Sequence, residues 1–448
     1  MLLLSAMSRI RRVSGTRPGS RLRIGAAVAL LTVSAAPALG GGRAATERVS
    51  VDSAGGQADG DSFTPAISGN GRYVAFISSA SNLVAGDSNS VPDVFVRDRR
   101  NGATERVSVD SAGGEANRES FLPAISASGS DVAFYSSASN LVAGDTNGVP
   151  DVFVRDRRTG VTERVSVDSA RGQANGGNFA PMISASGRYV AFESDASNLV
   201  AGDTNLSDDV FVHDRRTGVT ERVSVDSAGG QANAVSLSPA ISADGRYVAF
   251  YSFASNLVAG DTNNEQDMFV HDRRTGATER VSVDSAGGQA NDASFGPLAI
   301  SANGRDVAFA STASNLVAGD TNNEPDMFVR DRRRGATERV SVDGTGGQAD
   351  GGSFFPAISA DGRYVAFYSF ASNLVVGDTN ETYDVFVRDR RRGATERVSV
   401  DGAGGQANGG SFFPAISASG QDVAFQSAAS NLVAGDTNET TDVFVRQR

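Results

Sequence analysis

Residues 220–277 read TERVSVDSAGGQANAVSLSPAISADGRYVAFYSFASNLVAGDTNNEQDMFVHDRRTGA, and copies of this unit fill most of the 448-residue chain. The string TERVSVD begins at Thr46, Thr104, Thr162, Thr220, Thr278, Thr337 and Thr395. The copies are 58 residues apart, except for one step of 59 whose extra residue lies near Leu298. Repetition at a fixed period of about this size is typical of solenoids, propellers and arrays.

Each unit predicts four short β-strands and no helix. The apolar segments are four to six residues long, rich in Val, Ile and Phe, and bounded by Gly, Asn and Asp. In the copy quoted above we expect strand a at 239–242, strand b at 246–250, strand c at 267–272 and strand d at 278–284. Pairs such as Asn70-Gly71 and Asn101-Gly102 predict tight turns between a and b and between c and d, because Asn-Gly supplies the positive φ angles of a two-residue hairpin.

The strand pattern predicts an all-β, seven-bladed β-propeller made of four-stranded antiparallel blades. The runs Val-Ala-Phe and Val-Phe-Val do not alternate with polar residues, which indicates strands covered on both faces. Blades packed face to face in a ring provide that cover. The last copy stops after strand c, whereas a lone strand d, residues 46–52, precedes the first full unit. We therefore expect residues 46–52 to complete the blade formed by residues 411–448.

Two segments of the unit resemble a known repeat. Residues 241–250, ISADGRYVAF, together with residues 92–96, PDVFV, resemble the TolB-type, WD-like β-propeller repeat. The resemblance recurs in every copy and covers residues 46–448. It implies the fold and leaves the function open, because such blades occur in scaffolds, in periplasmic partner-binding proteins and as gating domains of peptidases. The segments SNLVAGDTN and DSAGGQANG are longer than in the compact form of that repeat.

The N-terminal segment predicts export. Residues 1–38 contain six Arg and no acid, and the apolar stretch 24–38 ends in Ala36-Pro37-Ala38. This order is typical of a signal peptide, and the stretch is short for a membrane span. We expect a signal peptide at 1–38, a linker at 39–45 and the propeller at 46–448, in a protein that is secreted, periplasmic or on the cell surface; an uncleaved anchor is the alternative. Cleavage would lower the net charge from −11 to −17, which disfavours nucleic acid as a partner.

Composition excludes several chemistries. The chain has no Cys, hence no disulfide and no thiolate ligand or nucleophile. Its only two His, His213 and His271, stand where sister copies carry Arg, and they are interpreted as neutral replacements. We expect no enzyme activity. The alternative is a carbohydrate-active hydrolase or lyase with acidic residues near the channel mouth, for which Glu193 and Asp195 are candidate paired carboxylates.

The long b–c and d–a loops are expected on one face of the ring, where a binding surface is most often found. The b–c loop carries Asp-(Thr/Ser)-Asn-x-x-x-Asp in every copy. Oxygen ligands at alternate positions suit Ca²⁺, whereas Asp and Asn also cap turns through their own backbone. The sequence is compatible with both a calcium site and turn capping, and no other cofactor is expected. The residues concerned are Asp87, Asn89, Asp93, Asp145, Asn147, Asp151, Asp203, Asn205, Asp209, Asp261, Asn263, Asp267, Asp320, Asn322, Asp326, Asp378, Asn380, Asp384, Asp436, Asn438 and Asp442.

The opposite face carries the short turns and is rich in Arg, with Arg99-Arg100 and Arg72 in the first copy. These residues fit either a polyanion such as a cell-wall phosphate polymer or local pairs with Asp98 and Glu105. Other departures from the repeat are Arg118, Glu119, Arg171, Phe253 and Phe370. We predict a monomeric, non-enzymatic binding scaffold that presents its long-loop face to a protein or glycan of the cell envelope or extracellular space.

Overall fold

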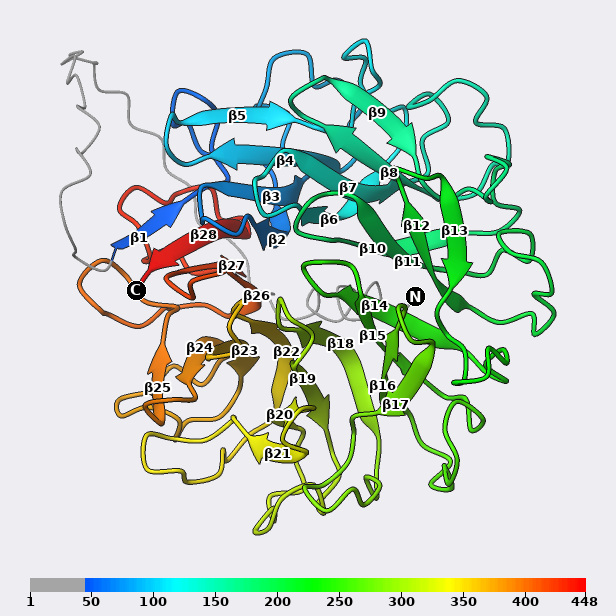
Figure 1. The fold of residues 1–448 in the computed structure, drawn as a ribbon. Coiled ribbons are helices and arrows are strands. Elements are labelled where there is room, and N and C mark those ends of the chain that lie inside the picture. The colour runs from blue at the N-terminus through cyan, green and yellow to red at the C-terminus, as the bar shows by residue number, and fades with distance from the viewer. Residues whose placement is uncertain (1–44) are drawn as a thin grey trace, which may run out of the picture. The chain divides into compact units, whose positions relative to one another are not determined.

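The computed structural model describes residues 45–448, and these form seven four-stranded antiparallel sheets arranged as a ring (Figure 1). In each sheet the strands lie in the order a, b, c, d from the axis to the outer edge. The predicted fold class is confirmed. The predicted signal peptide and nearly all of the linker lie outside the described residues.

The strands recur with nearly constant length. Strand a is β2 (Ser62–Ile67), β6 (Ser120–Ile125), β10 (Asn178–Ile183), β14 (Ser236–Ile241), β18 (Ser294–Ile300), β22 (Ser353–Ile358) and β26 (Ser411–Ile416). Strand b is β3 (Tyr73–Ser78), β7 (Asp131–Ser136), β11 (Tyr189–Ser194), β15 (Tyr247–Ser252), β19 (Asp306–Ser311), β23 (Tyr364–Ser369) and β27 (Asp422–Ser427). Strand c is β4 (Asp93–Asp98), β8 (Asp151–Asp156), β12 (Asp209–Asp214), β16 (Asp267–Asp272), β20 (Asp326–Asp331), β24 (Asp384–Asp389) and β28 (Asp442–Gln447). Strand d is β5 (Ala103–Arg106), β9 (Val161–Arg164), β13 (Val219–Arg222), β17 (Ala277–Arg280), β21 (Ala336–Arg339), β25 (Ala394–Arg397) and, from the start of the described chain, β1 (Ala45–Arg48).

The ring closes as predicted, because β1 pairs antiparallel with β28 in the sheet β1-β28-β27-β26. The paired strand ends at Arg48, and the next residue, Val49, still donates its backbone N–H to Val443 O at 2.8 Å. Val49 is 1% exposed. Figure 1 shows the two ends of the ring, β1 in blue and β28 in red, lying side by side.

The core consists of seven apolar clusters, each formed by residues of two neighbouring blades. In every blade a Phe of strand b stacks on a Phe of strand c, as Phe76 does on Phe95 with ring centroids 6.0 Å apart. Both rings are fully buried. The continuous apolar runs in the sequence are therefore strands covered on both faces.

Strand a contains a β-bulge that the sequence pattern did not predict. Its pairing with strand b shifts register after the second residue, for example between Phe63 and Ala66. The residue inside the bulge has a positive φ in all seven blades, although only Gly296 among these seven is a glycine. The extra residue near Leu298 is absorbed in this bulge, because β18 is one residue longer than the other a strands.

The turns between strands a and b differ from the predicted two-residue hairpins. In the first blade Gly71 has φ +72°, Asn70 is not in the left-handed region, and the Gly71 N–H donates to Ser68 O. A five-residue connection therefore replaces a two-residue turn with two positive φ angles. Ser68 explains the wider turn, because its hydroxyl accepts the Tyr73 N–H and donates to Asn70.

Candidate ligand-binding surface

The long loops pack against one another on a single face, called here the long-loop face. In the first blade the Asn82 amide donates to Gln57 O at 2.9 Å, and the Ser81 N–H donates to Asp59 at 2.7 Å. The same contacts between b–c and d–a loops recur around the ring, as in Asn140 to Glu115 O. Because hydrogen bonds join the b–c loops to the d–a loops, the backbone of the long-loop face is held in one conformation.

The predicted calcium ligands do come together, but around a guanidinium group that the sequence reasoning missed. Arg106 places Nη1 3.2 Å from Asp87 Oδ1 and 3.4 Å from Asp93 Oδ2. Asn89 turns its amide nitrogen toward Asp93 at 2.9 Å, and the Ser108 hydroxyl donates to the other oxygen of Asp93 at 2.5 Å. The corresponding arginines in the other blades are Arg48, Arg164, Arg222, Arg280, Arg339 and Arg397.

In each of these loops an arginine lies beside the candidate calcium ligands. Burial raises the pKa of Asp87 to about 6 against the opposing effect of Arg106, and Asp93 is fully buried with a raised pKa. Over residues 45–448 no group of three or more His, Cys, Asp or Glu side chains is placed to hold a metal ion. An incoming Ca²⁺ would have to displace the arginine and rotate the asparagine, so its binding remains a prediction.

The two histidines are structural. Each ring is buried, and Nδ1 lies 2.8 Å from Thr220 Oγ1 in His213 and 2.9 Å from Thr278 Oγ1 in His271. Burial lowers the pKa of both rings. In sister blades an Arg bonds the same threonine, as Arg97 does with Thr104.

The face that carries the a–b and c–d turns is called here the short-turn face. In every blade the arginine just after strand c donates hydrogen bonds to neighbouring carboxylates or backbone carbonyls on this face. Arg157 bonds Glu105 and stacks on the Tyr73 ring of the preceding blade at 4.5 Å. Arg215 instead pairs with Asp131, which stands in the position of that tyrosine, at 2.8 Å. These contacts agree with local pairing of the arginines.

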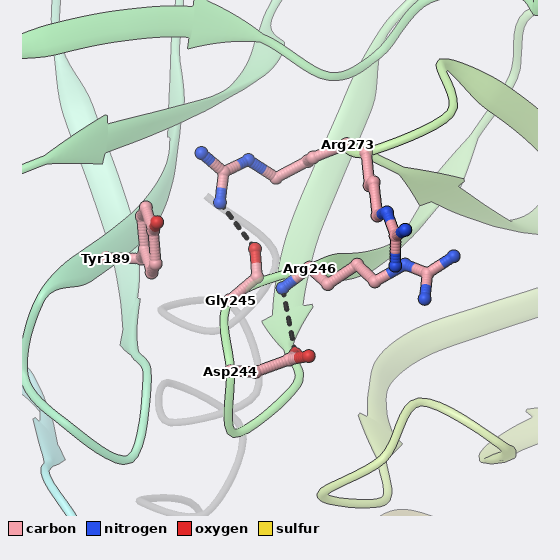
Figure 2. A pocket seen from close by; sticks show the side chains of 6 residues that line it. Tyr189, Asp244, Gly245, Arg246 and Arg273 are labelled. Carbon is pink, nitrogen blue, oxygen red and sulfur yellow. Dashed lines mark hydrogen bonds between the residues drawn. The ribbon is translucent and has the colours of Figure 1, made fainter.

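A pocket of about 360 Å³ lies on this face between two blades. Figure 2 shows it lined by Tyr189, Asp244, Gly245, Arg246 and Arg273, with Arg273 donating to Gly245 O and the Arg246 N–H donating to Asp244. The guanidinium groups of Arg246 and Arg273 are also paired, with Asp272 and with Glu221. Arg274, at the edge of the pocket, is exposed and forms no ion pair with a described residue.

Differences between the seven copies single out another surface. Of the 58 positions in the unit, only eight show four or more residue types. In the first blade these are Gly60, Asp61, Thr64, Ile77, Ser79, Ser90, Val91 and Pro92. They lie just before strand a, in its bulge, at the end of strand b and just before strand c. We call these positions, in all seven blades, the variable rim.

The variable rim is continuous around the ring on the long-loop face. Within a blade, the residue after strand b donates its N–H to the residue before strand a, as Ser79 does to Asp61 O at 3.0 Å. Between blades, the N–H at the start of strand a bonds the carbonyl just before strand c of the preceding blade, as Ser62 does with Thr441 O at 2.7 Å. Because strand a lies nearest the axis, the rim is the inner part of the long-loop face.

Side chains of the rim also bridge neighbouring blades. Glu193, at the end of β11, accepts the Ser238 N–H in the bulge of β14 at 2.8 Å, and Gln426 accepts the Thr64 N–H at 2.9 Å. Burial raises the pKa of Glu193. Burial, with the charge of Glu193, raises the pKa of both Tyr135 and Tyr251 to about 12. Glu193 is thus held by a backbone donor, whereas Asp195 is exposed.

An aromatic cluster interrupts the sevenfold symmetry of the rim in the two blades that contain β22 and β26. It consists of Phe354, Phe355, Tyr368, Phe370, Tyr383, Phe412 and Phe413. Neighbouring ring centroids are 4.7 to 6.4 Å apart. Phe370 is 51% exposed, and five of the seven residues stand at rim positions. Of these residues, sequence reasoning named Phe370 alone. Comparing the copies marks Phe355, Tyr368, Tyr383 and Phe413 as variable positions, but the contact between their rings is visible only in the structure.

The remaining departures from the repeat have local explanations. Arg171 adopts φ +70° where sister copies place a glycine with a positive φ. Phe253 packs edge-on against Tyr251 with centroids 6.4 Å apart. Arg118 and Glu119 are members of the variable rim.

Comparison with known proteins supports the fold alone. No protein-family model matches the chain, and no curated protein matches its sequence. The structure is similar to the β-propeller domain of the Trilobed protease from Pyrococcus furiosus, with 10% identity, coverage of 86% of this chain and 95% of that one, and a TM-score of 0.51. It is also similar to an oligogalacturonate lyase in complex with manganese, with 12% identity, coverage of 90% and 92%, and a TM-score of 0.52. For a TolB from Agrobacterium tumefaciens the identity is 14%, the coverage 66% and 83%, and the TM-score 0.39. Residues 45–448 contain no helix long and apolar enough to cross a membrane.

Proposed function

We propose that this chain is an exported, non-enzymatic binding scaffold whose ligand, a protein or glycan outside the cytoplasm, rests on the variable rim. One observation carries the proposal: the eight positions that vary most between otherwise near-identical repeats, each with four or more residue types, share one face. Positions that build the blade are held constant by packing. Variation on a rigid scaffold is typical of contact residues, because it changes what is bound without changing the fold.

The aromatic cluster strengthens this assignment. Exposed aromatic patches are typical of interaction sites, and buried aromatic anchors carry much of the binding energy in protein interfaces. Here Phe370 and Tyr383 lie at the edge of a larger packed group, with centroids 5.3 Å apart, so their rings are held in place before a ligand arrives.

A screen of the exported chain against envelope proteins and glycans, followed by paired variants, tests the proposal. Phe370→Ser changes the rim, and Arg274→Ser changes the short-turn face; both residues are exposed, so both variants should fold. We expect the first variant to weaken binding of whatever ligand is found and the second to leave it unchanged. Loss of binding only in Arg274→Ser would refute the assignment to the rim.

Turnover would refute the non-enzymatic part of the proposal. Glu193, Asp195 and Asp208 all stand at rim positions of one blade and are the acids from which a hydrolase or lyase would be built. Incubation with neutral and acidic oligosaccharides should yield no new reducing ends and no unsaturated products. Product formation that is abolished in Glu193→Gln would establish the enzymatic alternative.

A further inference from the structure

The variable rim carries an uncompensated negative charge. Ten carboxylates stand at rim positions: Asp61, Glu119, Glu193, Asp195, Asp208, Glu265, Asp292, Glu324, Glu381 and Glu439. Arg118 is the only basic residue at these positions. Within residues 45–448 none of the ten forms an ion pair, whereas the acids of the b–c loops and many acids of the short-turn face are paired with arginines.

Two of these acids lie near the aromatic cluster. Glu324 comes from the preceding blade, and its carboxylate lies 3.4 Å from the position that a Cβ on Gly352 would take, beside strand β22. Burial, together with the charge of Glu324, raises the pKa of Tyr383. Glu381 is two residues before Tyr383. Both glutamates are exposed.

Aromatic faces beside free carboxylates are complementary to cations. The ring quadrupole attracts an ammonium or guanidinium group over its face, and a nearby carboxylate adds a direct charge pair. A neutral glycan could only donate hydrogen bonds from its hydroxyl groups to these carboxylates and would leave their charge unneutralised, and an anionic ligand would be repelled by them. Among the protein and glycan ligands that the proposed function allows, charge complementarity therefore favours a cationic one.

We propose that the ligand is a protein segment with exposed Arg or Lys side chains, and that one of these side chains binds at the aromatic cluster between Phe370, Tyr383 and Glu324. This inference rests on the proposed function, because it names the chemistry of the ligand on the same rim. Further basic residues of the segment pair with the other rim acids.

Fluorescence anisotropy with labelled peptides tests the inference. The probes are a flexible Gly-Ser peptide carrying four arginines and the same peptide with glutamine or glutamate in place of arginine. We expect the arginine peptide to bind, with an affinity that falls by at least tenfold as salt rises from about 50 to about 300 mM, because screening weakens exposed charge pairs. The glutamine and glutamate peptides should not bind.

Matched variants separate this site from general attraction to an acidic protein. Phe370→Ala should weaken binding about tenfold, as expected for one cation–π anchor. Val219→Ala shortens an apolar side chain that is about equally exposed but lies at the start of β13 on the short-turn face, and it should change binding less than twofold. Glu324→Gln combined with Glu381→Gln should weaken binding, whereas Glu105→Gln, on the short-turn face, should not. Circular dichroism melts confirm that the variants are folded.

The outcomes distinguish the two proposals. Equal binding of the arginine and glutamine peptides, or equal effects of Phe370→Ala and Val219→Ala, overturns the cationic-ligand inference. A neutral glycan that binds and is lost in Phe370→Ala also overturns it while supporting the rim as the binding surface. Peptide binding that responds only to short-turn-face variants overturns both.

Discussion

The closing strand β1 should stabilise the ring as much as a strand d inside the chain does. Val49 in β1's extension and Val107 in the first full blade are both 1% exposed, and each donates its N–H to a strand c carbonyl at 2.8 Å. Each Val→Ala change removes apolar surface worth about 1.6 kcal/mol and leaves a small cavity, so the expected loss is about 2 kcal/mol in both variants. Val49 and Val107 therefore serve as matched sites, because they occupy the same position of the repeat and have the same burial and the same backbone hydrogen bond.

Urea unfolding followed by circular dichroism measures this loss. We expect Val49→Ala and Val107→Ala to lower the unfolding midpoint by similar amounts. A Val49→Ala shift less than a third of the Val107→Ala shift would refute the reasoning, because it would mean that β1 frays from β28 in solution.

Removal of residues up to Asp52 should lower the stability of the ring far more than Val49→Ala does. Asp442 is fully buried and would lose both Arg48 and the Ser50 hydroxyl, and a buried charge deprived of its partner is destabilising by about 3–5 kcal/mol. With the buried valines and the strand pairing, the loss is on the order of 10 kcal/mol, comparable to the stability of a whole domain. The truncated chain should show no cooperative melt, and a synthetic peptide of residues 44–53 should restore one. A normal melt without the peptide would contradict ring closure by β1.

Three further predictions concern the turns, the pH dependence and calcium. Gly129→Ala should be destabilising by about 2 kcal/mol more than Gly102→Ala, because both have positive φ but only the first Cβ would meet a tyrosine ring of the preceding blade, at 2.2 Å; equal losses would argue against this blade contact. Stability should rise as pH falls from about 6 to about 4, because burial raises the folded-state pKa of Asp87 to about 6. It should then fall toward pH 2, because the hydrogen bond from Arg305 lowers the folded-state pKa of Asp331 to about 2. Urea midpoints at pH 2.5, 4.5 and 7 check both signs, and a monotonic trend contradicts one of them. Neither Ca²⁺ nor a chelator should move the melting temperature, since guanidinium groups already pair with the loop carboxylates, and a rise of several degrees with Ca²⁺ would show that the ion displaces them.

The blade count, the strand order and the closure could be predicted from the sequence, because they follow from the repeat itself. Seven copies of four apolar segments fix the number of strands, and the lone TERVSVD at residues 46–52 has only one partner that lacks a strand d. The face on which the long loops lie follows from the antiparallel order of the strands. None of these inferences needs side-chain geometry.

The contents of the site could not be predicted in the same way. Arg106 lies 13 residues from Asp93 in the chain, and only the pairing of β4 with β5 brings the two side chains together. The bulge in strand a was hidden because its residues, such as Thr64 and Phe355, have no preference for positive φ. The aromatic cluster joins residues of two blades through contacts that no local pattern records.

Because the ring is closed, the chain termini could lie in any blade without changing the contacts between strands. Ala45 pairs with Gln447 across β1 and β28, so the first and last strands of the described ring are immediate neighbours, like any strands c and d inside the chain. A short linker joining these ends, with new termini opened in another c–d turn such as that at Gly102, would give a circular permutant with the same contacts. The variable rim lies on the opposite face from every c–d turn, so such permutants could present the same rim from up to seven different attachment points.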